Sequence, residues 1–197
     1  MNLDRTVYYH VVHMGDRSDL TREYERAFRD RWMCTKYWHF LGEPSAIDLY
    51  LDHEPHNTPL NTVPLVAGYA RIDFLQTIGI DLFREHFYIG RVVNDKGVTC
   101  DDFVSFRGKH WLLIRGNERS TYRRCEACGG HLYFPIGDHY LLADRLTDAP
   151  LYGCNLGGFI ADEEVYKRIT NRKWELVEFV ELPVLDKPQD GHDDLPL

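Results

Sequence analysis

Residues 87–97, Phe87-Tyr88-Ile89-Gly90-Arg91-Val92-Val93-Asn94-Asp95-Lys96-Gly97, give the strongest structural signal in this chain. The first seven are mostly β-branched or aromatic, which favours a strand. The last four are turn formers, and β-branched and aromatic residues resume over 98–106. The stretch therefore predicts a β-hairpin and a fold built on a sheet.

Further strands are expected on both sides of this hairpin, because short runs of alternating or β-branched residues recur along the chain. Their clearest example is the last, where Trp174, Leu176, Phe179 and Leu182 alternate with glutamates. Residues 52–64 contain three prolines and read as a loop. The expected strands are 6–12, 47–51, 111–114 and 174–182, with a short pair formed by 131–134 and 139–142.

Helices are expected where apolar residues recur with a period near 3.6. The pattern predicts helices over 19–33 and over 69–79, the second ending at Gly79. A third begins at Asp162, whose carboxylate can cap it, and runs to about Thr170 with Val165 and Ile169 on its buried side.

These elements predict an α+β fold with a mixed or antiparallel sheet and two to three helices. We expect one domain over residues 1–185, with a CxxCG knuckle on a hairpin. Residues 186–197 are polar, acidic and contain proline, so a disordered tail is expected there. The 197-residue chain is 44% hydrophobic and 13% aromatic, which is enough to build a core without disulfides.

The formal net charge of −8 makes nucleic acid an unexpected partner, because an acidic surface repels phosphate backbones. A basic protein is the natural complement. No apolar run reaches the roughly 18 residues of a membrane span, and the N-terminus does not resemble a secretory signal. Five cysteines, an odd number, suit reduced thiols. We therefore expect a cytoplasmic protein with no membrane partner.

The sharpest local motif is Cys125-Glu126-Ala127-Cys128-Gly129-Gly130. Two cysteines at this spacing can aim both thiolates at one tetrahedral metal, but a structural zinc site closes with four ligands. Only one such motif is present, so we expect a reduced, metal-free turn and keep zinc at Cys125 and Cys128 as the alternative.

No catalytic motif stands out, since nucleophile-elbow, P-loop and dinucleotide-binding patterns are all missing from the sequence. Residues 52–56 contain metal-ligand side chains, but Pro55 and the loop setting favour a solvated acidic loop. The arginines 115, 119, 123 and 124 suit a charged hairpin face paired with neighbouring acids. No catalytic residue is therefore predicted, and the protein is not expected to be an enzyme.

The region from Cys125 onward has a recognisable order. The CxxCG motif is followed by Leu132-Tyr133-Phe134-Pro135, Tyr140-Leu141-Leu142, Tyr152, Gly157-Gly158-Phe159-Ile160, the Asp162-capped helix and Val177-Glu178-Phe179. This order resembles the C-terminal half of the double-CxxCG immunity proteins of bacterial polymorphic toxin systems, and more loosely the Imm11-type immunity family. In the N-terminal half, Cys34-Thr35-Lys36-Tyr37 has tyrosine where the first motif of that family has its second cysteine.

The resemblance implies an immunity protein that binds a cognate toxin domain in the cytoplasm and occludes its active site. An acidic surface with aromatic anchors would cover a basic cleft. A zinc-ribbon-bearing module that binds nucleic acid or scaffolds an assembly is the alternative, followed by an enzyme whose site is built from scattered residues. The candidate partner-binding residues are Asp52, Glu54, Asp101, Asp102, Trp111 and Tyr133.

Overall fold

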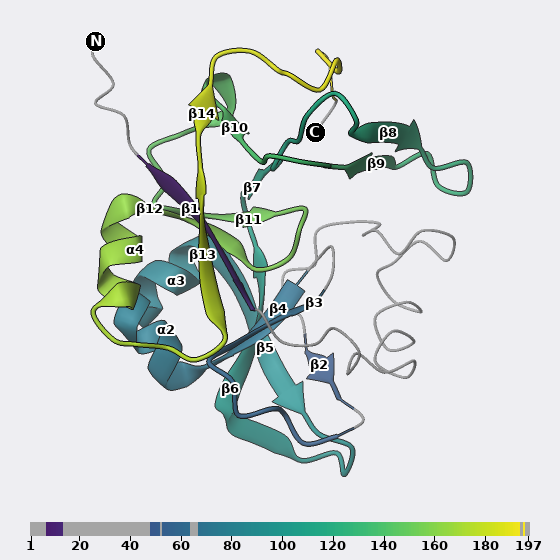
Figure 1. The fold of residues 1–197 in the computed structure, drawn as a ribbon. Helices are drawn as coiled ribbons and strands as arrows, with labels where there is room; N and C mark the ends of the chain where they lie inside the picture. The colour runs from purple at the N-terminus through teal and green to yellow at the C-terminus, as the bar shows by residue number, and fades with distance from the viewer. Residues whose placement is uncertain (1–6, 14–47, 52, 64–66, 194, 196–197) are drawn as a thin grey trace.

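The protein is described here from a computed structural model, which places residues 7–13, 48–51, 53–63, 67–193 and 195. Within these residues the chain forms a single α+β domain that contains mixed and antiparallel sheets (Figure 1). The predicted α+β class with a mixed or antiparallel sheet is therefore confirmed, whereas the CxxCG knuckle that we expected stays a prediction. The expected helix over 19–33 lies outside the described residues.

The first sheet has five strands, and every neighbouring pair is antiparallel except the parallel pair β11–β7. β1 follows the predicted strand over 6–12 closely. In spatial order the strands are β13 (Val177–Leu182), β1 (Tyr8–His13), β12 (Phe159–Asp162), β11 (Leu151–Cys154) and β7 (Trp111–Leu112).

The second sheet contains the predicted hairpin at its centre, and only its β2–β5 pair is parallel. β3 lies within the expected loop over 52–64, so that prediction is wrong for the last residues of the loop. The spatial order is β2 (Leu49–Tyr50), β5 (Phe87–Val93), β6 (Thr99–Gly108), β4 (Ala67–Arg71) and β3 (Leu60–Val63).

The described helices α2 (Ile72–Ile78), α3 (Ile80–His86) and α4 (Glu163–Thr170) lie together on one side of the domain (Figure 1). The helix expected over 69–79 does end at Gly79, but its first residues belong to β4 and a second helix follows at once. For α4 the prediction is confirmed in detail. The Asp162 carboxylate accepts a hydrogen bond from Val165 N at 2.8 Å, and Val165 and Ile169 are buried.

The main core lies between these helices and the two sheets. Its centre is a cluster of aromatic rings, in which Phe83 stacks on Phe87 at 4.2 Å and meets Phe106 and Phe159 edge-on. Because these four rings come from α3, β5, β6 and β12, their packing joins both sheets to the helices. Gly108 and Gly153 are also in close approach, and a Cβ on Gly108 would lie 2.6 Å from the Gly153 backbone.

Two smaller pairings lie at the far end of the first sheet. The hairpin β8 (Thr121–Arg124) and β9 (His131–Phe134) projects away from the main sheets, and β10 (Leu141–Leu142) pairs in parallel with β14 (Val184–Leu185) (Figure 1). The predicted pairing of 131–134 with 139–142 is therefore wrong. A 3-10 turn, η2 (Ala143–Arg145), follows β10.

The C-terminal segment differs from its expectation. The sequence predicted a disordered tail over 186–197, whereas residues 186–193 run back over the end of the domain that carries β8 and β9 (Figure 1). Asp190 is only 3% exposed, and Gln189 N donates a hydrogen bond to the Tyr140 hydroxyl at 2.6 Å. A buried ion pair, described below, outweighs the polar composition that suggested disorder.

Candidate interaction surface

The predicted residues Glu54, Asp101 and Asp102 come together at the turn end of the β5–β6 hairpin. All three are exposed, and Asp95 in the turn itself is exposed too. We call these four residues the acidic hairpin end. Asp101 and Asp102 are consecutive in β6, in the part of the strand where its register against β5 shifts between Arg91 and Val93.

Asn94 organises this turn. Its side-chain oxygen accepts hydrogen bonds from Lys96 N at 3.1 Å and Val98 N at 2.8 Å, while Asn94 N donates to Val98 O at 2.9 Å. Its side-chain amide donates to Glu54 Oε1 at 2.9 Å. Asn94 is only 7% exposed, so the turn and Glu54 are held by a buried side chain that uses both its oxygen and its amide nitrogen.

The charges at the acidic hairpin end are only partly balanced. Lys96 Nζ lies 3.2 Å from Glu54 Oε1, in a pair whose side chains are both more than half exposed. Such an exposed pair contributes little to stability. Burial raises the pKa of the Cys100 thiol, and the charges of Glu54 and Asp101 raise it further.

An apolar side chain stands among these acids. Val98 is 56% exposed, the largest exposure among the large hydrophobic residues that the structure describes as exposed. A single exposed apolar residue is ordinary on a protein surface, so Val98 adds to the candidate surface only through its place beside the acids. Sequence reasoning found Glu54, Asp101 and Asp102 but missed Val98 and the organising Asn94, although Asn94-Asp95-Lys96-Gly97 had marked the turn.

The other predicted partner-binding residues do not join this surface. Asp52 lies outside the described residues. Trp111 is half-buried beyond the opposite end of β6, with its indole N–H donating to Gly108 O at 2.8 Å and Arg107 over its ring. Tyr133 is only 7% exposed, and its hydroxyl accepts from Gly116 N at 2.9 Å. Its burial removes Tyr133 from the candidate surface.

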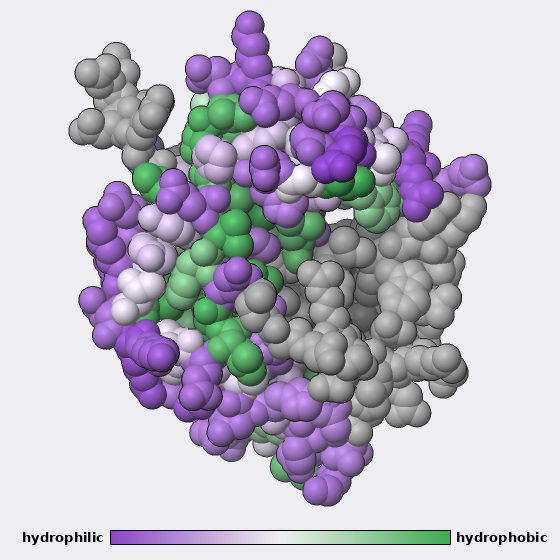
Figure 2. Space-filling view, in the orientation of Figure 1, coloured by the Kyte–Doolittle hydropathy of each residue, from purple (hydrophilic) through white to green (hydrophobic). Residues whose placement is uncertain are grey.

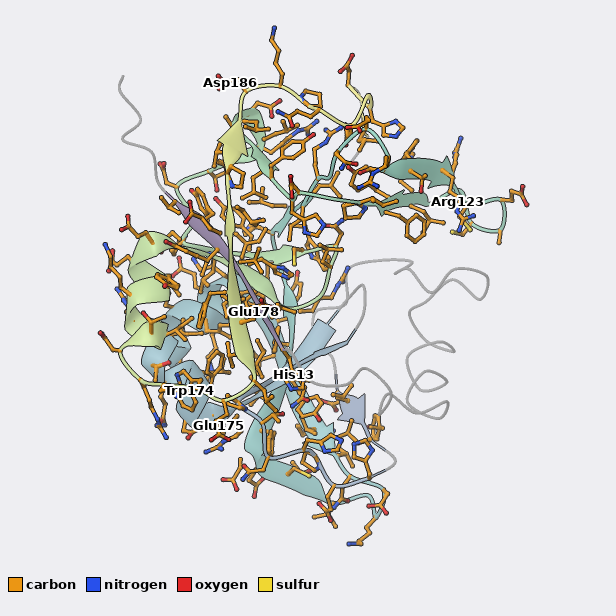
Figure 3. The ribbon with its side chains drawn as sticks, in the orientation of Figure 1. His13, Arg123, Trp174, Glu175, Glu178 and Asp186 are labelled. Carbon is orange, nitrogen blue, oxygen red and sulfur yellow. The ribbon has the colours of Figure 1, made fainter. Side chains whose placement is uncertain are left out.

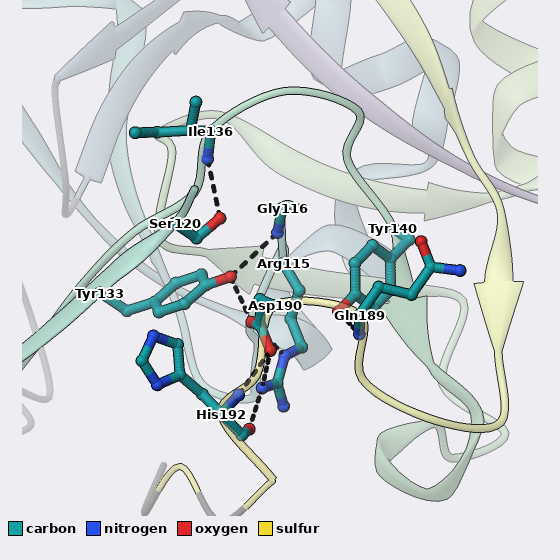
Figure 4. Close-up of polar contacts among 9 residues, drawn as sticks. All are labelled: Arg115, Gly116, Ser120, Tyr133, Ile136, Tyr140, Gln189, Asp190 and His192. Atoms are coloured by element: carbon teal, nitrogen blue, oxygen red, sulfur yellow. Dashed lines mark hydrogen bonds and ion pairs between the residues drawn. The ribbon is translucent and has the colours of Figure 1, made fainter. Parts of the chain in front are cut away.

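Tyr133 belongs instead to a buried polar network around Asp190 (Figure 4). Arg115 Nε and Nη2 donate to the two Asp190 carboxylate oxygens at 2.9 and 2.7 Å, and the Tyr133 hydroxyl donates to the same carboxylate. Burial alone would raise the pKa of Asp190, but the hydrogen bonds from Arg115 and Tyr133 outweigh it and lower that pKa. The network fixes the C-terminal segment against the β9 hairpin strand.

The predicted zinc residues lie in the loop that joins β8 to β9. Cys125 N donates to Gly130 O at 2.7 Å, and Gly130 N points at Cys128 Sγ at 3.4 Å. Cys125 is buried and Cys128 exposed. In the described part of the chain, no three His, Cys, Asp or Glu side chains gather in a way that could hold a metal. The described donors therefore fall short of the four that close a structural zinc site.

The arginines expected on a charged hairpin face divide in two. Arg115 is buried in the Asp190 network, whereas Arg119, Arg123 and Arg124 are exposed, on or beside β8.

No helix among the described residues has the length and apolar character needed to cross a membrane. Neither a protein-family model nor a curated protein matches this sequence.

Proposed function

We propose that this protein works by binding rather than by catalysis, as an immunity protein that occludes the active site of a cognate toxin domain. The observation that carries the proposal is the acidic hairpin end. Three carboxylates that we expect to contact a partner are exposed at this end of the hairpin together with Val98, and the side chain of Asn94 holds the turn by hydrogen bonds. The resemblance from Cys125 onward supplies the class of partner.

The physical mechanism is charge complementarity followed by burial. A basic cleft, such as one that binds nucleic-acid phosphates, would be attracted to Asp101 and Asp102 and then covered. The net charge of −8 would accelerate the encounter, and added salt would slow it. A rigid turn favours affinity because few side chains lose freedom on binding. We expect the protein to act in the cytoplasm, where it would meet the toxin domain.

The experiment is coexpression with the product of the neighbouring gene, which the proposal predicts to contain the toxin domain. Cells that express both should survive, and the two proteins should copurify. The charge-reversed variant Asp101→Lys/Asp102→Lys is expected to weaken binding at least tenfold, mainly through a slower association rate. The matched control is Asp144→Lys/Asp148→Lys, which makes the same charge change at exposed positions elsewhere.

Two results would count against the proposal. If neither protection nor a complex is observed, the immunity function itself is wrong. If a complex forms and both charge-reversed variants bind equally, the function stands but the acidic hairpin end is not its surface. Both variants change only exposed side chains, so both should stay folded, and a difference in their binding reports on the surface itself.

A further inference from the structure

A second surface lies along β13, which ends the strand order of the first sheet. β13 pairs with β1 on one side through all six of its residues, from Val177 opposite His13 to Leu182 opposite Tyr8. Among the described strands, none pairs with its other side. Figure 1 shows β13 running along the front of the domain with that side uncovered by described elements. An open strand edge offers backbone N–H and C=O groups to another strand.

Apolar side chains follow this edge. Val177, Phe179 and Val180 are each partly exposed, and Leu176 at the start of the strand is 50% exposed. Figure 2 shows hydrophobic side chains along the course of β13, with a hydrophilic surface on the side of the helices. The inner face is firmly packed, since Phe179 meets the Tyr166 ring of α4 edge-on at 5.2 Å. β13 is therefore held in place by its packing, and its open edge carries apolar side chains beside the backbone groups that another strand could pair with.

Leu176 stands in an unusual conformation. Its φ of 58° is the only positive φ at a non-glycine residue in the described part of the chain. A left-handed conformation is unfavourable for leucine, which has a branched side chain and no polar group to bond locally. Strained, exposed apolar residues cluster at binding sites, where their position rather than their stability is what matters.

The charges beside the edge determine which partner fits. Glu175 and Glu181 are exposed and Glu178 is partly exposed. Figure 3 shows Glu175 and Glu178 near the lower half of β13. Among the described residues, the ion pairs within 4 Å include none of the three glutamates. A second copy of β13 would bring like charges together, which is destabilising across paired strands. A strand that carries lysine or arginine would instead meet opposite charges.

We propose that the open edge of β13 binds an extended segment of another protein, in which lysine or arginine alternates with apolar residues. The segment adds as a further strand to the first sheet. Backbone hydrogen bonds provide the pairing, and Leu176 provides an apolar anchor. Glu178 and Glu181 lie three residues apart, on opposite faces of β13, so the basic side chains of an alternating segment meet Glu178 in one register and Glu181 in the other. β13 shares no residue with the acidic hairpin end, so this inference stands apart from the proposed function.

The test uses the full chain and a probe peptide, an acetylated and amidated heptapeptide that alternates lysine and valine. Binding is expected to slow hydrogen exchange at β13 amides that do not pair with β1, while the amides of β5 and β6 stay unchanged. A heptapeptide with glutamate in place of lysine is expected to bind at least tenfold more weakly. No added protection in β13 would overturn the proposal.

Variants separate the contributions of charge and anchor. Glu175→Gln/Glu178→Gln/Glu181→Gln is expected to weaken the lysine peptide about tenfold, and Leu176→Gly to weaken it severalfold. The matched control Glu85→Gln/Glu118→Gln/Asp144→Asn removes the same number of exposed charges away from β13 and should leave binding unchanged. Equal weakening in the control would show nonspecific attraction and overturn the proposal. So would sedimentation as a dimer that protects the β13 edge without peptide.

Discussion

Arg115 and Asp190 lie 75 residues apart in the sequence and form a bidentate ion pair in the interior, with side chains that are 4% and 0% exposed. Arg115 also donates to the carbonyl of His192. The pair fastens the C-terminal segment to the part of the domain that contains β9. A buried ion pair of this kind stabilises the fold little relative to apolar residues of similar size. Removal of one partner is costly, however, because the other charge then stays buried without a counter-charge.

Asp190→Asn is therefore expected to lower the free energy of unfolding by about 3 kcal/mol, because the Arg115 guanidinium keeps its charge without a counter-charge. Urea denaturation of both proteins measures the difference. Asp186→Asn, an exposed position on the same segment, is the control and should change stability by less than about 0.5 kcal/mol. A loss as small as the control's for Asp190→Asn would contradict the buried pair.

Stability is also expected to depend on pH through His10. Its ring is 5% exposed and bonds to Gly157 O at 2.7 Å, and burial lowers the pKa of the imidazole despite that bond. Below the unfolded pKa of about 6.5, the unfolded chain binds a proton that folded His10 does not. The free energy of unfolding should therefore fall as the pH falls from 7.5 to 5.

Denaturation curves across this range measure the slope, and His10→Gln is expected to make it shallower. Burial also lowers the pKa values of His13, His86 and His139, so part of the slope should remain. The exposed His110→Gln is the control and should keep the full slope. An unchanged slope in His10→Gln would show that this ring is protonated equally in both states.

The elements that the sequence predicted well are those whose signals are local. The β5–β6 hairpin follows from its turn residues, and α4 follows from the Asp162 cap and the spacing of Val165 and Ile169. The helix over 69–79 was misplaced because apolar residues at a strand end and a helix start look alike in a short window. Gly79 was correctly identified as a helix end, but no local sequence signal predicted that α3 begins directly after it.

The features that escaped prediction have two different causes. The pairing of β9 with β8 is local, because the two strands flank the CxxCG loop, but Thr121-Tyr122-Arg123-Arg124 has no apolar alternation that would have marked it as a strand. The ordering of Asp190 depends instead on Arg115, which lies 75 residues away in the sequence. For the candidate surface, exposed acids near a turn could be chosen from the sequence. The burial of Tyr133 could not, because its partner Asp190 is 57 residues away.

The Asp162 cap provides a test of the best-predicted element. Asp162→Ala is expected to cost about 1 kcal/mol of stability, because Val165 N loses its acceptor. Burial raises the pKa of the Asp162 carboxyl, so the charge itself is not favoured there. Asp162→Asn keeps an acceptor oxygen and should cost much less. Thermal and urea unfolding of the two variants measure the difference, and equal losses would show that charge rather than capping matters.

The contact between Gly108 and Gly153 tests how closely β6 and β11 approach. A Cβ on Gly108 would lie 2.6 Å from backbone atoms of Gly153, whereas a Cβ on Gly153 would lie 3.0 Å from Gly108 Cα. Gly108→Ala is therefore expected to cost about 3 kcal/mol and Gly153→Ala about 1 kcal/mol. Urea denaturation measures both values, and the reverse order would contradict the observed approach.

Substitutions of Leu176 test whether the native leucine lowers the stability of the fold. Leu176→Gly is expected to raise the free energy of unfolding by about 1 kcal/mol, because glycine adopts a φ of 58° without steric cost. Leu176→Ala removes most of the same side chain but keeps a Cβ in the left-handed conformation, so it should give no such gain. Urea denaturation measures both. Equal stabilities would mean that the backbone at 176 is not strained, whereas a gain confined to glycine would show that the native leucine is kept at a cost in stability.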